Sequence, residues 1–256
     1  MLNKLFIGTN LKMYKTIKQT VSFLTELDSL TSDISKNDAE IFIVPSFTAL
    51  AAAGEIAARS NIMLGAQNMS WEDEGQYTGE ISPVMLKEIG VRVVEIGHSE
   101  RRHVFGENDE VENKKVHAAQ RHSLIPLLCI GETERQKELG IADEVLRTQL
   151  KVGLFGVKAE TAGQIWIAYE PVWAIGINGK PATSEYAAEK HAVIHAALDE
   201  LFGKTAAGII PVLYGGSVNN TNAAEFIKMP YIDGLFIGRS AWDAVNFNKI
   251  IREVLP

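Results

Sequence analysis

The residue with the clearest chemical potential is Glu170, which closes the apolar run 165–170 and precedes a proline. A short apolar run of this kind is typical of a buried strand. Pro171 ends the strand because its ring fixes φ and removes the backbone N–H. A carboxylate held at the edge of an apolar core is suited to take a proton from carbon near neutral pH. Taken alone, a solvent-exposed glutamate at a strand end is the alternative.

A long loop follows Glu170 and runs through Gly176 and the segments 178–179 and 180–181. Loops of this length within a compact domain are usually functional, and many of them cover a site. We therefore expect residues 171–182 to form a lid over the region around Glu170.

Short apolar runs alternate with longer amphipathic stretches along the 256 residues. The expected strands are 5–10, 40–45, 62–66, 91–96, 125–130, 165–170, 209–214 and 232–237. The expected helices are 17–30, 48–58, 111–122, 142–152, 184–201, 222–227 and 246–254. Eight strand-then-helix units with continuously apolar strands predict an α/β (β/α)₈ barrel, with residues 1–256 as a single domain. An open doubly wound sheet is the alternative, but no G-x-G-x-x-G follows the first strand.

Barrel enzymes carry their chemistry on the loops that follow the strands. Asn10 and Lys12 follow the first expected strand, and a lysine there can supply a fixed positive charge for a phosphate or an oxyanion. His98 follows the fourth, and Ser99 and Glu100 resemble the first turn of a helix. A helix N-terminus favours a neutral imidazole that can donate a hydrogen bond. A surface lysine and a helix-capping histidine are the alternatives.

Glycine-containing turns follow the last two expected strands. Residues 214–218 contain a glycine pair and Ser217, and residues 238–242 begin with Gly238 and Arg239. Glycine lets the backbone approach a ligand closely, and barrels commonly bind phosphate at these two loops. Together the turns predict a phosphate-binding site.

These residues predict proton abstraction beside the carbonyl of a small phosphorylated sugar. Glu170 would remove the proton, and His98 and Lys12 would stabilise the enediolate. The proton would return to the adjacent carbon, so the reaction needs no redox cofactor. We also predict no metal, since His191 and His195 have no third ligand and are interpreted as helix-surface residues.

The composition excludes several other classes of function. The net charge of −7 is spread along the chain, which argues against a nucleic-acid or anionic-membrane partner. No apolar run approaches membrane-spanning length. Cys129 is the only cysteine and lies in an apolar run, so we expect a core thiol in a reducing compartment.

The sequence resembles the triosephosphate isomerase family essentially from residue 6 to the C-terminus. The motifs that carry the resemblance occur in the family's order at 8–12, 65–68, 77–82, 96–102, 129–133, 168–176 and 214–218. The resemblance implies a cytoplasmic, cofactor-free isomerase that interconverts dihydroxyacetone phosphate and D-glyceraldehyde 3-phosphate.

The resemblance also implies roles for individual residues. Asn10 and Lys12 match the family's substrate binders, His98 its electrophile and Glu170 its base. The phosphate-binding positions are Gly176, Ser217 and Gly238. The family is homodimeric, and loop 67–82 matches the arm that enters the partner subunit, with Thr78 near the partner's active site.

The chain departs from the family pattern near the substrate. Its lid is one residue longer and has Pro181 at the C-terminal hinge, and Arg239 replaces the second glycine of a Gly-Gly pair. Glu95 occupies a strand position that is usually aliphatic, and it needs a partner if it is buried. Residues 71–73 alter the arm.

These departures favour a second candidate substrate with four carbons. The same base and electrophile could convert L-erythrulose 1-phosphate to D-erythrulose 4-phosphate, which has the triose framework plus a hydroxymethyl group on the reacting carbon. An inactive phosphate-binding barrel is the remote alternative. Retention of the whole set Asn10, Lys12, His98 and Glu170 argues against it, because a binding module needs no carbon base.

Overall fold

Eight parallel strands form a closed barrel in the computed structural model, which describes residues 2, 4–176 and 179–255. The strands pair in chain order and are β1 (Leu5–Asn10), β2 (Ala39–Val44), β3 (Met63–Ala66), β4 (Val93–Ile96), β5 (Ile125–Ile130), β6 (Trp166–Tyr169), β7 (Val212–Tyr214) and β8 (Gly234–Ile237). The predicted (β/α)₈ barrel is therefore confirmed, and β1 and β5 have the expected bounds.

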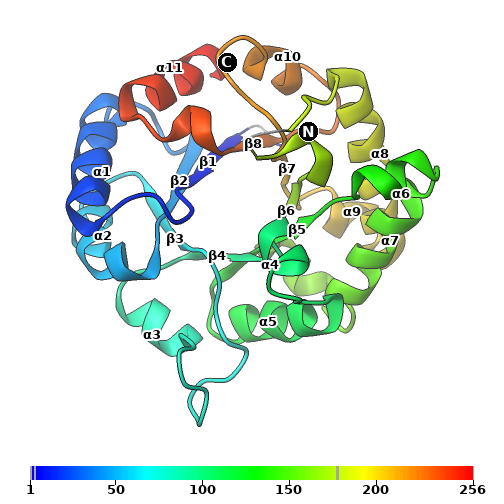
Figure 1. The fold of residues 1–256 in the computed structure, drawn as a ribbon, viewed down its shortest axis with the longest axis horizontal. Coiled ribbons are helices and arrows are strands. Elements are labelled where there is room, and N and C mark those ends of the chain that lie inside the picture. Colours follow the sequence, from blue (N-terminus) through cyan, green and yellow to red (C-terminus); the bar gives the residue numbers. More distant parts are fainter. Residues whose placement is uncertain (1, 3, 177–178, 256) are drawn as a thin grey trace.

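Helices surround the barrel on all sides (Figure 1). The α-helices are α1 (Ile17–Thr31), α2 (Leu50–Ala57), α3 (Pro83–Glu88), α4 (Ser99–His103), α5 (Asp109–Arg121), α6 (Glu134–Glu138), α7 (Ala142–Gly153), α8 (Ser184–Phe202), α9 (Lys204–Ala207), α10 (Ala223–Ile227) and α11 (Ala244–Val254). Short 3₁₀ turns are η1 (Phe47–Ala49), η2 (Ala159–Gln164), η3 (Val172–Ala174) and η4 (Arg239–Ala241). Within the described residues, no helix is both long enough and apolar enough to cross a membrane.

Helix α11 shows how the sequence places a helix against the barrel. Its buried side chains include Phe247, Ile250, Ile251 and Val254, whose spacing puts them on one face. The side chain of Asp243 caps the helix by accepting a hydrogen bond from the N–H of Asn246 at 2.8 Å. This cap starts the helix two residues before the expected position.

Aromatic side chains fill the lower interior of the barrel. The ring of Trp166 packs edge-on against Phe6 and Phe42, with centroids 5.0 and 5.4 Å apart. Phe42 also stacks on Phe236 at 5.5 Å. This aromatic layer lies below the polar residues at the C-terminal ends of the strands.

One interpretation of the sequence is wrong. His191 is fully buried rather than on the surface of α8, and its Nδ1 lies 2.9 Å from the carbonyl oxygen of Tyr231. His195, one turn later, is partly exposed and also contacts that carbonyl. The apolar residues of α8 surround most of the helix, so the periodic pattern did not identify the buried side.

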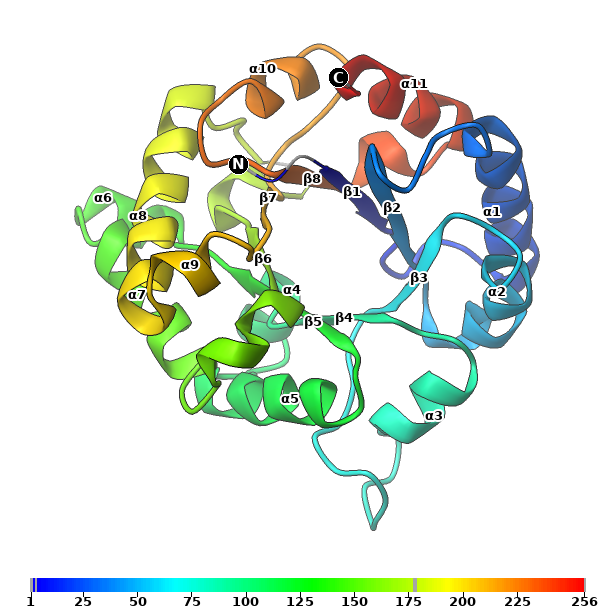
Figure 2. The same ribbon diagram turned by 180° about the vertical axis from the view of Figure 1, so that it is seen from behind.

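Loop 67–82, between β3 and α3, projects away from the barrel and is seen from both sides in Figures 1 and 2. Residues 73–80 are all exposed, and the ring of Tyr77 packs near Trp71 at a centroid distance of 6.3 Å. Thr78 lies on the exposed part of this loop. That this loop is an arm that enters a partner subunit stays a prediction.

Candidate active site

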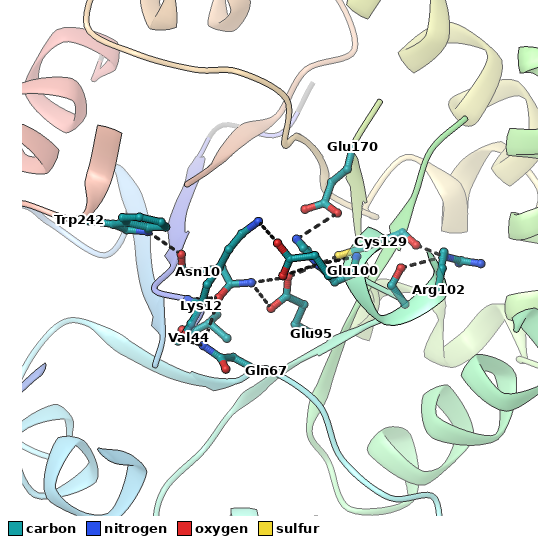
Figure 3. A network of polar contacts seen from close by, with 12 residues as sticks. Asn10, Lys12, Val44, Gln67, Glu95, Glu100, Arg102, Cys129, Glu170 and Trp242 are labelled. Carbon is teal, nitrogen blue, oxygen red and sulfur yellow. Dashed lines mark hydrogen bonds and ion pairs between the residues drawn. The ribbon is translucent and has the colours of Figure 1, made fainter. Parts of the chain in front are cut away.

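The predicted catalytic residues converge at the C-terminal ends of β1, β4 and β6. Asn10 is the last residue of β1, His98 follows β4 and Glu170 directly follows β6. The Nε2 atom of His98 lies 3.8 Å from Oε2 of Glu170. Figure 3 shows Asn10, Lys12, Glu95 and Glu170 pointing toward a common centre. The parallel strands therefore bring together side chains that are up to 160 positions apart.

Local structure fixes the orientation of His98. Gly97 has φ +74°, a left-handed conformation that turns the chain sharply after β4. His98 then caps α4, and its Nδ1 accepts a hydrogen bond from the N–H of Glu100 at 3.2 Å. Because an accepting Nδ1 carries no proton, we assign the neutral tautomer with the proton on Nε2. That N–H is directed toward Glu170, as expected of an electrophile.

Arg102 holds α4 against the barrel. Its guanidinium donates hydrogen bonds to the carbonyl oxygens of Gly97 at 2.8 Å and Cys129 at 3.0 Å. These bonds tie the His98 turn to both β4 and β5. Ser99, the first residue of α4, is buried at this junction.

Glu170 is buried yet has an oxygen available for chemistry. Only 4% of the residue is exposed, and Oε2 has no hydrogen-bond partner among the described groups. Gly215 lies beneath it: a Cβ there would come within 2.8 Å of Cγ of Glu170. The glycine of the motif 214–218 therefore makes room for the base.

Lys12 is held in a strained backbone conformation, with φ +49°. Its N–H donates to Oδ1 of Asn10 at 2.7 Å, and its carbonyl accepts from Nε2 of Gln67 at 2.8 Å. Its ammonium group bonds Oε1 of Glu100 at 2.7 Å. Partial burial opposes ionisation of Glu100, but the hydrogen bond and charge of Lys12 hold the pKa of Glu100 below its usual value.

Glu95 has the partner that its burial requires. It is 1% exposed, and both carboxyl oxygens accept hydrogen bonds from Nδ2 of Asn10, at 3.0 and 2.9 Å. Burial, and then the negative charge of Glu170, raise the pKa of Glu95 well above its usual value. The same causes raise the pKa of the buried Cys129 thiol.

One cluster of metal-ligand type occurs in the described part of the chain. Single atoms of Glu95, His98 and Glu170 all lie within 4.8 Å of one another. Such a set could hold a divalent cation, but Glu95 already bonds Asn10 and His98 turns an N–H toward the site. The expectation that the protein uses neither metal nor cofactor stays a prediction.

Comparison with known proteins identifies the family. The family model described as triosephosphate isomerase matches residues 5–254. The chain belongs to the triosephosphate isomerase family. It is an isomerase, as its named relatives are.

Relatives of the triosephosphate isomerase family with two different names resemble the chain. An L-erythrulose-1-phosphate isomerase of Rhizobium etli is 48% identical over 252 residues, covering 97% of this chain and 92% of the relative. A triosephosphate isomerase of Acetivibrio thermocellus is 45% identical, covering 98% and 99%. The crystal structure of triosephosphate isomerase from Bartonella henselae matches with a TM-score of 0.86 and 40% identity, covering 97% and 98%.

The expected phosphate-binding residues of this isomerase follow three neighbouring strands. Gly176, Ser217 and Gly238 come after β6, β7 and β8, which are paired in that order. The carbonyl of Ser217 accepts a hydrogen bond from Nδ2 of Asn222 at 3.0 Å, which fixes that turn. Arg239 is exposed at the start of η4. Of the lid, Ile177 and Asn178 lie outside the described residues.

A carboxylate that the sequence did not single out fixes the beginning of the lid. Glu132 is fully buried and accepts hydrogen bonds from Nε1 of Trp173 at 2.7 Å and from the hydroxyls of Tyr186 and Tyr169 at 2.9 and 3.1 Å. Glu132 belongs to the family motif 129–133, and this motif was the only feature of the sequence that pointed to a role for it. Trp242, which ends the turn 238–242, was expected from the sequence only to add bulk near the substrate, but its Nε1 also donates to the carbonyl of Asn10 at 2.8 Å.

Proposed function

We propose that this isomerase moves a carbonyl group between adjacent carbons of a small sugar phosphate through an enediolate, without a cofactor. The observation that carries the proposal is the pair formed by Oε2 of Glu170 and the protonated Nε2 of His98, 3.8 Å apart. A base with a free lone pair and a neutral hydrogen-bond donor face the same space. Such a pair can flank a carbon that loses a proton and the oxygen that gains charge.

The reaction balances without any other reagent. Glu170 takes the proton from the carbon beside the carbonyl, and the electron pair of that C–H bond moves to the carbonyl oxygen. The N–H of His98 and the ammonium group of Lys12 stabilise the resulting charge. The hydroxyl proton of the carbon that was deprotonated passes to the enediolate oxygen, and the proton on Glu170 passes to the former carbonyl carbon, so the neighbouring carbon becomes the new carbonyl. One carbon is oxidised and its neighbour reduced, so no external oxidant or reductant is needed.

Two substrate pairs fit this chemistry. The first is dihydroxyacetone phosphate and D-glyceraldehyde 3-phosphate, the pair implied by the family. The second is L-erythrulose 1-phosphate and D-erythrulose 4-phosphate, favoured by the relative of that name at 48% identity. In both cases the phosphate would bind the turns at Gly176, Ser217 and Gly238, with Arg239 beside them.

The experiment that tests the chemistry is the Glu170→Gln variant. It preserves shape but removes the base, so we expect kcat to fall by about 10²–10⁴-fold. Affinity for a phosphate ligand should change little. The matched control is Glu160→Gln on the exposed turn η2, which should keep wild-type turnover. Turnover that survived in Glu170→Gln would show that another group is the base, and a wild type that binds phosphate ligands without turnover would support the inactive barrel.

We also propose a homodimer in the cytoplasm, built through loop 67–82. Exposed large apolar side chains support a contact surface after β1, β2 and β3, which are neighbours in the barrel. They are Met13, Tyr14, Ile17, Phe47, Tyr77, Val84 and Met85. The single buried cysteine suits a reducing compartment.

A further inference from the structure

Glu95 is an unusual residue for the inside of this barrel. It lies on β4 two residues above Val93, which belongs to the interior apolar cluster, and it is 1% exposed. An aliphatic side chain would fill this position without any cost of desolvation. A carboxyl group there is unfavourable unless it forms hydrogen bonds that offset its burial.

The hydrogen bonds inside the protein satisfy Glu95 only in part. Its one strong partner is Nδ2 of Asn10, a neutral donor, at 2.9 and 3.0 Å. Lys12 directs its ammonium group to Glu100 instead, and none of the ion pairs among the described residues includes Glu95. Burial therefore raises the pKa of Glu95, as described above. A carboxyl group in its acid form offers one O–H donor and an acceptor oxygen, which matches the needs of an alcohol.

Glu95 lies where the end of the substrate opposite its phosphate is expected. The reacting carbon has to lie between Glu170 and His98, and an oxygen of Glu95 is within 4.8 Å of the functional atoms of both. The phosphate end is directed to the turns after β6, β7 and β8. The other substituent of the reacting carbon is therefore directed toward β1 and β4, where Asn10 and Glu95 are bonded to each other.

Small side chains line the barrel beside this group. Cys129 and Ala168 face the interior at paired positions of β5 and β6, and Sγ of Cys129 lies 4.0 Å from Oε1 of Glu95. Larger aromatic residues form the layer below, around Trp166. On β5 and β6, the region next to Glu95 is thus bordered by the small side chains of Cys129 and Ala168.

We propose that Glu95 and Asn10 form a hydroxyl-binding subsite that takes the terminal hydroxymethyl group of a four-carbon ketose phosphate. This inference rests on the proposed enediolate chemistry and selects the four-carbon pair as the substrate for which the site is built. A triose phosphate carries hydrogen at this position and leaves the subsite unused. Glu95 is then a specificity-determining residue rather than a part of the proton-transfer machinery.

The test compares two variants on two substrates. Glu95→Leu removes the hydrogen bonds at similar volume, and Glu95→Gln keeps a donor and an acceptor. For Glu95→Leu we expect kcat/KM on L-erythrulose 1-phosphate to fall about 100-fold, while kcat/KM on dihydroxyacetone phosphate changes less than about 3-fold. Glu95→Gln should keep most of the activity on the tetrulose. The control Leu127→Met, a volume-conserving change at the paired position of β5, should affect both substrates slightly and equally.

A measurement on the wild type alone makes the test independent of variant folding. Erythritol 4-phosphate carries the terminal hydroxyl, and its 1-deoxy analogue lacks it. We expect the hydroxyl to strengthen binding by about 10-fold or more. Equal affinities would overturn the subsite.

The remaining outcomes separate this inference from the proposed function. Equal losses on both substrates in Glu95→Leu would mean that Glu95 acts only by holding Asn10, and this result would overturn the inference. A wild type active on trioses but inactive on the tetrulose would also overturn it, while leaving the enediolate chemistry in place. If the wild type turned over neither substrate, the proposed function would fail, and the comparison of the polyol phosphates alone would decide the subsite.

Discussion

His191 links the stability of the protein to pH through a single buried ring. Complete burial lowers its pKa to about 3, although the hydrogen bond to the carbonyl of Tyr231 opposes the shift. The unfolded chain binds a proton near the ordinary pKa of 6.5, whereas the folded chain does not. The contribution to stability is therefore complete above pH 6.5 and is lost as the pH falls from 6.5 toward 3.

We predict that the free energy of unfolding declines between pH 6.5 and 4.5 by up to about 1.4 kcal/mol per pH unit from this residue. Urea titrations at a series of pH values would measure the slope. The slope should be smaller in His191→Gln. Ala196→Ser, an exposed change without a titratable group on the same helix, is the control and should keep the wild-type slope. Identical slopes in all three proteins would contradict the prediction.

At the scale of residues, the sequence identifies groups that act directly and misses groups that act through others. Glu170 and His98 were found because each follows an apolar run, and the structure places them 3.8 Å apart. Glu132 and Gln67 were not singled out, because each acts through a hydrogen bond to a residue far away in the chain. Glu132 accepts from Trp173, 41 positions away, and Gln67 donates to the carbonyl of Lys12, 55 positions away. For Glu95 the sequence could state that a partner was needed but could not name Asn10, which lies on another strand.

At the scale of elements, the first turn of the lid is tied to the barrel by a backbone bond from the N–H of Val172 to the carbonyl oxygen of Glu132 at 3.0 Å and by one side-chain hydrogen bond. Trp173 in η3 donates to Glu132, while Tyr186 donates to the same carboxylate from α8. We predict that Trp173→Phe loosens the lid and lowers kcat/KM about 10-fold, because one donor to a buried carboxylate is lost. Water would then reach the enediolate, so release of inorganic phosphate should rise relative to isomerisation.

The control for this prediction is Tyr186→Phe. It also removes one donor from Glu132, but it leaves the bond to the lid intact. We expect a similar loss of thermal stability in both variants, with increased phosphate release only in Trp173→Phe. Equal phosphate release in the two variants would show that Glu132 acts on stability and not on the lid.

Among the elements, strands were predicted better than short helices. The strands are continuously apolar because both of their faces are buried, and this pattern is visible in a few residues. The helices α3, α4, α6, α9 and α10 have six residues or fewer, too few to show a clear helical period, and of these only α10 and the start of α4 were anticipated. β7 begins at Val212 rather than at 209, because Pro211 has no N–H to donate and Ile209 is 56% exposed.

At the scale of the whole molecule, the closed parallel barrel explains why distant residues make one site. The C-terminal ends of all the strands lie at the same rim of the barrel. Residues that follow different strands are therefore brought together by the barrel itself. The same geometry places the loops after β1 and β2 beside the projecting loop 67–82, which follows β3 (Figure 1). Any partner that covers these loops therefore lies close to the substrate.

We predict that the chain forms a dimer of twice its 28.1 kDa mass and that the arm is required for it. Tyr77→Asp puts a charge on the exposed face of the arm, so we expect sedimentation equilibrium to show a shift toward monomer. Activity should then fall at low protein concentration, because the arm is predicted to approach the partner's site. Phe155→Asp is the matched control, since it charges another exposed aromatic residue outside the arm and should leave the dimer intact. A wild type that sediments as a single chain at micromolar concentration would exclude any role for a partner's Thr78, and the site would then be complete within one barrel.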